Sequence, residues 1–275
     1  MSGERKNRSN LKRELDDMAR RLGPGHLAFD PIRHPRRYAA GPDREVAALL
    51  SALFAYGNVT SMGAFLGSLL GALGPSPFET LRMGALPKRL PLYRFQTSAD
   101  VRAVLKAVGA VLSKHGGLEA AFCRTAGDAE ERLEAFARLL RKEARSSSPG
   151  VLHLLPLPSD GSACKRWWMF LRWVVRPDDG VDLGLWTCLG PRDLRIPVDT
   201  HVARIAFALG LVNRSTADRL FSIMLTDSLR AFCPEDPTRY DFALAHLGIL
   251  GECPKRQVAS ICKACSLRPH CRLGK

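Results

Sequence analysis

The chain has 275 residues, of which 46% are hydrophobic, and its 41 Lys and Arg against 27 Asp and Glu give a formal net charge of +14. The length suits one large domain or two small ones that share a core. Because no segment is apolar enough for a membrane span or a signal peptide, we expect a cytoplasmic, nucleoid-associated protein. The charge surplus favours a nucleic acid as partner and not a membrane, the alternative being a chain that is merely basic.

Residues 1–44 are polar, basic and rich in Pro and Gly, and we expect an N-terminal extension with one short helix, "LKRELDDMARRLG". Residues 45–252 carry apolar residues at helical spacing, which predicts a helical domain. Asp43 is the expected cap of a helix through "REVAALLSALFAYG", and a second helix begins after Asn58 or Thr60. Proline interrupts the chain between 75 and 96, and two long helices follow, one of them capped by Ser98.

The second half continues this pattern. A sixteen-residue loop, 146–161, leads to "SACKRWWMFLRWVVR", which predicts a buried helix that ends at Pro177. Further helices are expected at 200–210 and near 215–232 and 237–250. With no convincing run of strands, the sequence predicts an all-α protein of two helical lobes flanking a cleft. The middle segment, about 75–210, would form one lobe, and the N-terminal and C-terminal helices would form the other.

Four of the eight cysteines lie close together in residues 253–275, which we call the cysteine tail: Cys253, Cys262, Cys265 and Cys271. Four thiolates at this range can enclose a [4Fe-4S] cluster or a tetrahedral zinc ion. Zinc ribbons usually join two Cys-x-x-Cys knuckles, and only one is present here, so the iron–sulfur cluster is favoured and zinc is the alternative. A reducing compartment argues against structural disulfides, so the remaining cysteines are expected to stay free.

The cysteine tail resembles the iron–sulfur loop of endonuclease III and the adenine DNA glycosylases, although its first gap is two residues longer. The segment "IPVDTHVARI" closely resembles the one that holds the catalytic aspartate of the helix–hairpin–helix (HhH-GPD) DNA glycosylase superfamily. The two motifs occur in the same order as in that superfamily, and the resemblance covers about residues 45–272. It implies a monomeric enzyme that flips a damaged base out of double-stranded DNA and cleaves its N-glycosidic bond.

The resemblance assigns the catalytic carboxylate to Asp199. Breaking the glycosidic bond develops positive charge on the sugar, and a nearby carboxylate can stabilise it or orient the nucleophile. The alternative role is a cap for the helix that begins at Thr200. The two roles are compatible, because a capping aspartate can also face a cleft.

The hairpin that precedes the aspartate in this superfamily matches "LPLPSDGSACKR" only in part. Ser159 stands where the first turn glycine is expected, Gly161 fits the second, and Ala163 occupies the position of the catalytic lysine of bifunctional members. Either water is the nucleophile, or Lys165 is the amine that forms a Schiff base and permits strand cleavage. Contact with DNA phosphate is an equal alternative for Lys165 and for its neighbour Arg166.

Three further residues are expected at the DNA. Tyr56 and Asn58 lie where the superfamily has a wedge that fills the gap left by the flipped base, the alternative being a simple turn. His201 follows the aspartate and either contacts DNA or packs. The tryptophans of residues 167–173 could stack on a base but stand at core spacing. The first expected substrate is an oxidised purine such as 8-oxoguanine, and the rival interpretation is a non-catalytic DNA- or RNA-binding module that retains the fold.

Overall fold

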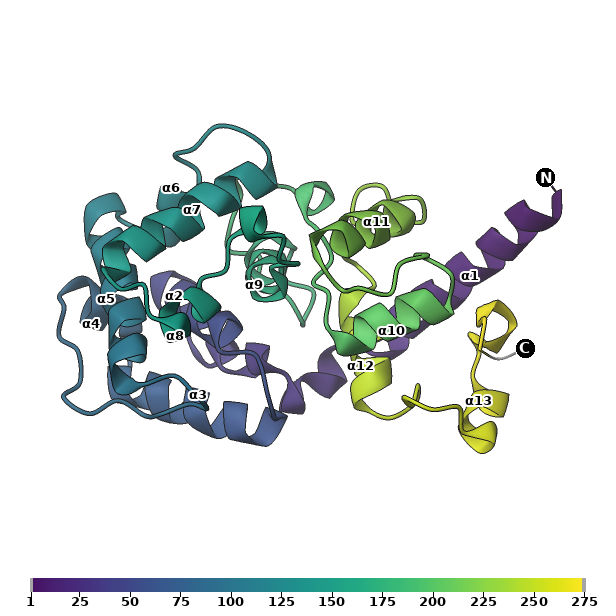
Figure 1. The fold of residues 1–275 in the computed structure, drawn as a ribbon, viewed down its shortest axis with the longest axis horizontal. Helices are drawn as coiled ribbons and strands as arrows, with labels where there is room; N and C mark the ends of the chain where they lie inside the picture. The colour runs from purple at the N-terminus through teal and green to yellow at the C-terminus, as the bar shows by residue number, and fades with distance from the viewer. Residues whose placement is uncertain (1, 274–275) are drawn as a thin grey trace.

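The computed structural model describes residues 2–273, without the side chains of residues 2–6 and 29 (Figure 1). Over this range the protein is all-α, as predicted: α-helices and short 3-10 helices alternate with loops, and the range contains no β-strand. Among the described helices, none combines the length and the apolar character that a membrane span requires.

The first hydrophobic core is built from residues between Ile32 and Leu194 and occupies the left half of the view in Figure 1. Helix α9 crosses the middle of the molecule, and its tryptophans Trp167 and Trp173 are fully buried in this core, as expected. The helices of this half are α2 Pro42–Leu53, α3 Val59–Leu73, α4 Pro77–Arg82, α5 Ser98–His115, α6 Leu118–Phe122, α7 Ala129–Ala144, α8 Pro149–Leu154 and α9 Lys165–Val175.

The second core joins the two ends of the chain, as predicted, because residues 11–22 pack with residues 196–267. The border between the cores lies near residue 195, and α2 and α3 belong to the first core, so the limits of about 75–210 for the middle lobe are corrected. The helices of this half are α1 Ser2–Arg21, α10 Thr200–Ala208, α11 Arg219–Arg230, α12 Asp241–Ile249 and α13 Ala259–Ala264.

Local signals placed most helices but misplaced two caps. Asn58 caps α3 as expected, and its side chain accepts a hydrogen bond from the Ser61 amide. Asp43 is not a cap: it lies inside the first turn of α2 and accepts a hydrogen bond from the Phe78 amide instead. Thr97, not Ser98, caps α5. The expected loop 146–161 contains helix α8, and the first half of the N-terminal extension is the long helix α1.

Candidate active site between the two cores

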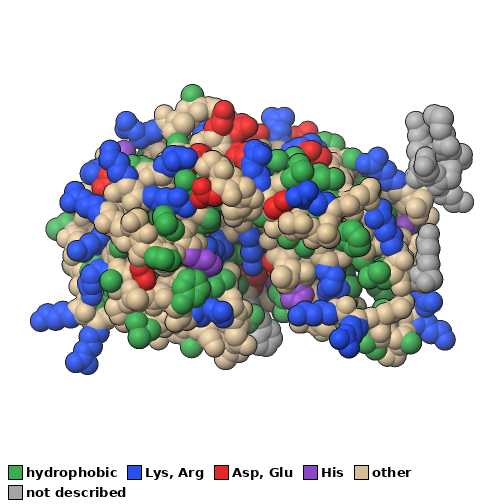
Figure 2. Space-filling model, in the orientation of Figure 1, with side chains coloured by type: hydrophobic (Ala, Val, Ile, Leu, Met, Phe, Trp, Pro, Cys, Tyr) green, Lys and Arg blue, Asp and Glu red, His purple; other side chains and the backbone are tan. Residues whose placement is uncertain are grey.

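A cavity of about 540 Å³ opens between the two cores. The first core contributes Tyr56, Lys165 and Met169 to its wall, and the second contributes Asp199 and His201. This volume is within the range of about 300–1,000 Å³ that is usual for small-molecule sites. Figure 2 shows this face hollowed between the two halves, with lysine and arginine side chains on both sides of the hollow.

Asp199 is placed for both roles that the sequence left open, helix cap and catalytic carboxylate. Its Oδ1 accepts hydrogen bonds of 2.8 Å from the backbone amides of His201 and Val202, and so caps α10. Its Oδ2 lies 3.9 Å from Lys165 Nζ and faces the cavity. One oxygen therefore fixes the side chain to the helix, and the other stays available for chemistry.

Lys165 is the first residue of α9, and its ammonium group points at the carboxylate of Asp199. Cys164, directly before it, has a left-handed backbone with φ of 47° and a buried side chain. A β-carbon makes this conformation unfavourable, so the surrounding packing must hold it. The bend brings α9 into the cavity at its first residue and places a lysine beside a carboxylate 34 residues further along the chain.

A second carboxylate, Asp241, lines the same cavity and was not predicted from the sequence. It begins α12 and accepts a hydrogen bond from Nη1 of Arg172, a buried residue of α9. Arg172 also lies 3.0 Å from Asp182, so the two cores share an ion-pair network directly behind the cavity. Only the fold could reveal this carboxylate, because its arginine is 69 residues away.

Arg166 lines the cavity but is only 8% exposed, and its guanidinium is bonded to backbone carbonyls, which corrects the predicted phosphate contact. Its guanidinium is buried and donates to the carbonyl oxygens of Leu53 and His153, while its Cζ lies 5.2 Å from the centre of the Tyr56 ring. Burial lowers the pKa of Arg166 to about 10. It therefore holds α2, α8 and the cavity wall together.

Tyr56 lines the cavity, but it is anchored and not free to enter DNA. Its hydroxyl donates to Gln96 Oε1, its carbonyl oxygen accepts from the Tyr93 hydroxyl, and burial raises its pKa. Asn58 is exposed, caps α3 and does not line the cavity. The residue between them, Gly57, has φ of +86°, which fits the simple turn; the anchoring of Tyr56 argues against its wedge role, and that of Asn58 stays a prediction.

Sequence reasoning missed two exposed apolar side chains, Phe95 and Leu92, and the first of them packs against the cavity wall. Phe95 is 55% exposed and Leu92 is 68% exposed. A tight turn from Tyr93 to Gln96 presents Phe95, whose ring centre is 4.9 Å from that of His153 in the cavity wall. Both ends of the turn are buried and bonded to Tyr56, so the turn is rigid. The only sequence signal for these exposed side chains is the short run "LYRF" at residues 92–95, which begins and ends with an apolar residue.

The hairpin glycine, Gly161, takes the left-handed conformation with φ of 77° in the loop between α8 and α9. The amides of Asp160 and Gly161 donate to backbone carbonyls, and the Ser159 amide donates to Glu134 Oε2 at 3.0 Å. These amides are therefore already bonded, and a carboxylate stands where a phosphate would have to bind. These bonds argue against the predicted DNA contact at Gly161, which stays a prediction.

His201 lines the cavity and packs against α12. A Cβ atom added at Gly248 would lie only 2.3 Å from Nδ1 of His201, so glycine at this position makes room for the ring. The structure thus joins Asp199, Lys165, Tyr56 and His201 around one cavity, whereas Asn58 and Gly161 lie outside it.

A family model described as "Protein of unknown function (DUF2400)" matches residues 30–250. The chain belongs to the DUF2400 family. No curated protein and no solved structure matches the chain. The match to DUF2400 includes every residue that lines the cavity and ends before the cysteine tail.

The cysteine tail, outside the DUF2400 match, docks on α10. Arg204 of α10 donates to Cys253 Sγ at 3.1 Å and to the backbone carbonyls of Cys253 and Pro254. The Arg272 amide donates to the Ala208 carbonyl. The other three tail cysteines raise the pKa of Cys265, after the larger effect of burial, because their thiolates would add like charge nearby. The four tail cysteines therefore lie in the same region of the structure.

The described residues hold one triad of closely spaced potential metal ligands, and it lies outside the tail: Glu119, Cys123 and Cys188. Cys123 and Cys188 are joined by a disulfide, which corrects the expectation that all cysteines outside the tail are free. The physical reason is the fold around Glu119, whose carboxylate accepts hydrogen bonds from the amides of Thr187 and Cys188 and so brings that loop against α6.

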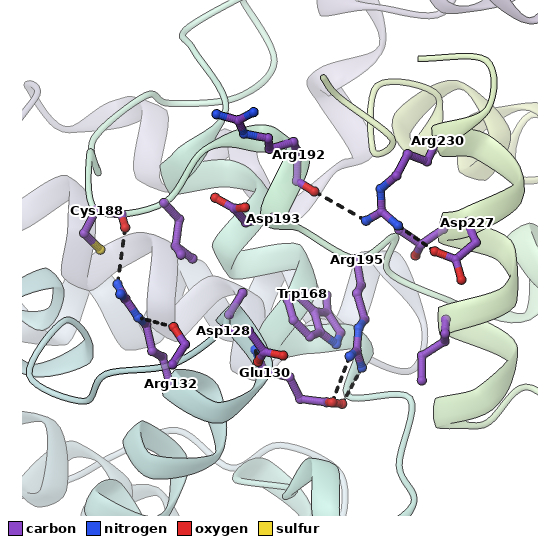
Figure 3. A pocket seen from close by; sticks show the side chains of 15 residues that line it. Asp128, Glu130, Arg132, Trp168, Cys188, Arg192, Asp193, Arg195, Asp227 and Arg230 are labelled. Atoms are coloured by element: carbon purple, nitrogen blue, oxygen red, sulfur yellow. Dashed lines mark hydrogen bonds and ion pairs between the residues drawn. The ribbon is translucent and has the colours of Figure 1, made fainter. Parts of the chain in front are cut away.

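A second cavity, of about 480 Å³, opens between the start of α7 and α11 (Figure 3). Two of its arginines are paired with carboxylates of the same wall: Arg195 with Glu130, and Arg230 with Asp227. We assign no ligand to this cavity.

Proposed function

We propose that this DUF2400 protein is a DNA glycosylase of base excision repair, and that the cavity between the cores receives a flipped base. The observation that carries the proposal is the pair formed by Lys165 and Asp199 in that cavity, 3.9 Å apart. A lysine and a carboxylate are the two groups that a bifunctional glycosylase needs at the sugar. The +14 charge supports a polyanionic partner.

Base extrusion requires a group that replaces the base in the stack. We assign this role to Phe95, because it is exposed on a rigid turn and its ring packs against His153 of the cavity wall. Apolar wedges of this kind unstack a base step at a cost of a few kcal/mol and so favour a kinked duplex with one nucleotide extruded.

In the chemistry we propose, the Lys165 ammonium first loses a proton to water. Its amine then attacks C1′ of the sugar, and the base departs with the electron pair of the C1′–N bond and takes up a proton. Asp199 Oδ2 stays ionised beside C1′ and stabilises the positive charge that develops there. The resulting Schiff base between Lys165 and the sugar permits strand cleavage by elimination, which is the lyase activity. The first substrate to test is an oxidised purine such as 8-oxoguanine.

We further propose that the cysteine tail holds a [4Fe-4S] cluster, which supplies structural stability. The donor set fits: four thiols lie in one region, and a guanidinium contacts the Cys253 sulfur and favours its thiolate. The single Cys-x-x-Cys knuckle of the tail, formed by Cys262 and Cys265, favours the cluster over zinc, because zinc ribbons usually join two such knuckles.

Borohydride trapping tests the proposal. The protein is mixed with duplexes that carry one 8-oxoguanine, one oxidised pyrimidine or one alkylated purine, and reduction should leave a covalent protein–DNA adduct with one of them. Lys165→Ala should abolish the adduct, and Lys142→Ala, on the exposed end of α7, is the matched control that should retain it. If base release occurs in the parent without any adduct, water is the nucleophile and the lysine only binds.

The second candidate function is a non-catalytic DNA-binding module, which the blocked hairpin favours. Glu134 occupies the amide of Ser159, so the loop between α8 and α9 lacks the phosphate clamp of the superfamily that the chain resembles. This candidate predicts salt-dependent duplex binding with neither base release nor a trapped adduct on any lesion.

A further inference from the structure

The two carboxylates of the cavity have opposite surroundings. Asp199 accepts two backbone hydrogen bonds and lies beside Lys165, an arrangement that stabilises the ionised form. Asp241 is only 5% exposed and has a single hydrogen-bond donor, Arg172, among the described residues. Pairs of carboxylates whose environments differ in this way commonly divide the roles of acid and stabilising anion between them.

Burial raises the pKa of Asp241 to about 7, against the opposing effect of Arg172, and the charge of Asp199 acts in the same direction as burial. Two buried arginines behind the cavity, Arg172 and Arg176, form ion pairs with a larger number of carboxylates, among them Asp182, Asp236 and Asp241. Asp241 can therefore be neutral without leaving either arginine unpaired. The charged and titratable groups around Asp241 or on the cavity wall near it are Arg172, Lys165, Asp199, Asp182, Asp30, His201 and His246.

We propose that Asp241 is the catalytic acid that protonates the departing base, an inference that rests on the proposed glycosylase function. The proton moves from the Asp241 carboxyl to a ring nitrogen of the base while the C1′–N bond breaks and its electron pair leaves with the base. The Lys165 nitrogen forms the new bond to C1′, and the extra proton of that adduct returns to the Asp241 carboxylate through water. Asp199 remains anionic throughout, so atoms and charges balance.

This division of labour specifies the class of substrate. A neutral base, such as an oxidised purine, is a poor leaving group until a ring nitrogen is protonated. A purine alkylated at N7 already carries a positive charge and departs without an acid. The geometry therefore suits neutral damaged bases, and excision of cationic bases should not depend on Asp241.

The test is single-turnover excision by the parent and by Asp241→Asn, on duplexes with 8-oxoguanine and with 7-methylguanine, between pH 5.5 and 8.5. The parent rate on the neutral base should fall above about pH 7, as the acid loses its proton. Asp241→Asn should excise the neutral base at least about a hundredfold more slowly, with a flat pH profile, and should change cationic-base excision only a few-fold.

Asp182→Asn is the matched control, because Asp182 binds the same arginine without lining the cavity. If this control unfolds, Asp236→Asn, on the neighbouring Arg176, replaces it. Equal losses in Asp241→Asn and the control, equal slowing of both bases, or a parent that excises only the cationic base would each overturn the inference. A parent that releases no base at all instead refutes the proposed function itself.

Discussion

Replacing Asp199 by asparagine and by alanine separates the helix cap from the carboxylate. Oδ1 accepts two amides at 2.8 Å, and an asparagine Oδ1 can accept both, since Asn and Asp are about equal as caps. Asp199→Asn should therefore change the free energy of unfolding by less than about 0.5 kcal/mol, whereas Asp199→Ala should cost about 1 kcal/mol. Both variants lose the negative charge beside Lys165, which should slow excision about 10²- to 10³-fold, or about 3–4 kcal/mol of transition-state stabilisation.

Three measurements check this prediction: urea unfolding, affinity for a lesion duplex and single-turnover excision. The expected pattern is similar excision losses in both variants, different stabilities, and affinity within a few-fold of the parent. Excision at the parent rate by Asp199→Asn would refute the reasoning, because the residue would then be a cap alone.

Other predictions follow from the rim, the tail and the first core. Phe95→Ala should weaken base excision more than duplex binding, and 2-aminopurine fluorescence beside the lesion should report less unstacking; unchanged fluorescence would remove Phe95 as the wedge. Protein purified without oxygen should be brown with about four irons per chain, and stoichiometric zinc without iron would contradict the cluster. Burial lowers the pKa of His34 to about 4, so the folded state resists its protonation and stability falls as the pH drops below about 6.5. His34 should contribute about 2 kcal/mol to the stability lost between pH 7 and 5, and urea unfolding of His34→Gln should show a loss smaller by that amount; identical slopes for both proteins would exclude this histidine as a cause.

Local patterns were enough for most of the helices. Asn58 and Asp199 are side chains that hydrogen-bond amides two or three residues away, so their capping roles are encoded in a few neighbouring residues. Helix α8 was missed because "PGVLHL" is too short to show helical periodicity and lies between prolines. The sequence placed the cap of α5 one residue too late, because Thr97 and Ser98 both carry a hydroxyl group that can cap a helix.

The site was harder to predict because its members come together only in the fold. The motif "IPVDTHVARI" identified Asp199, and the position after the hairpin identified Lys165. Asp241 had no local signal, since its value as an acid depends on burial and on Arg172, 69 residues away. Arg166 was misassigned for the converse reason: a basic residue at a helix start normally reaches solvent, and here the carbonyls of α2 and α8 enclose it.

The most direct test of the central claim is mass spectrometry of free bases released from DNA. Genomic DNA, untreated, oxidised or alkylated, is incubated with the protein and with Asp199→Asn, and the small-molecule fraction is analysed. The account predicts release of at least one damaged base by the parent and a loss of about a hundredfold in the variant. DNA binding without release of any free base would contradict the glycosylase proposal and favour the binding module.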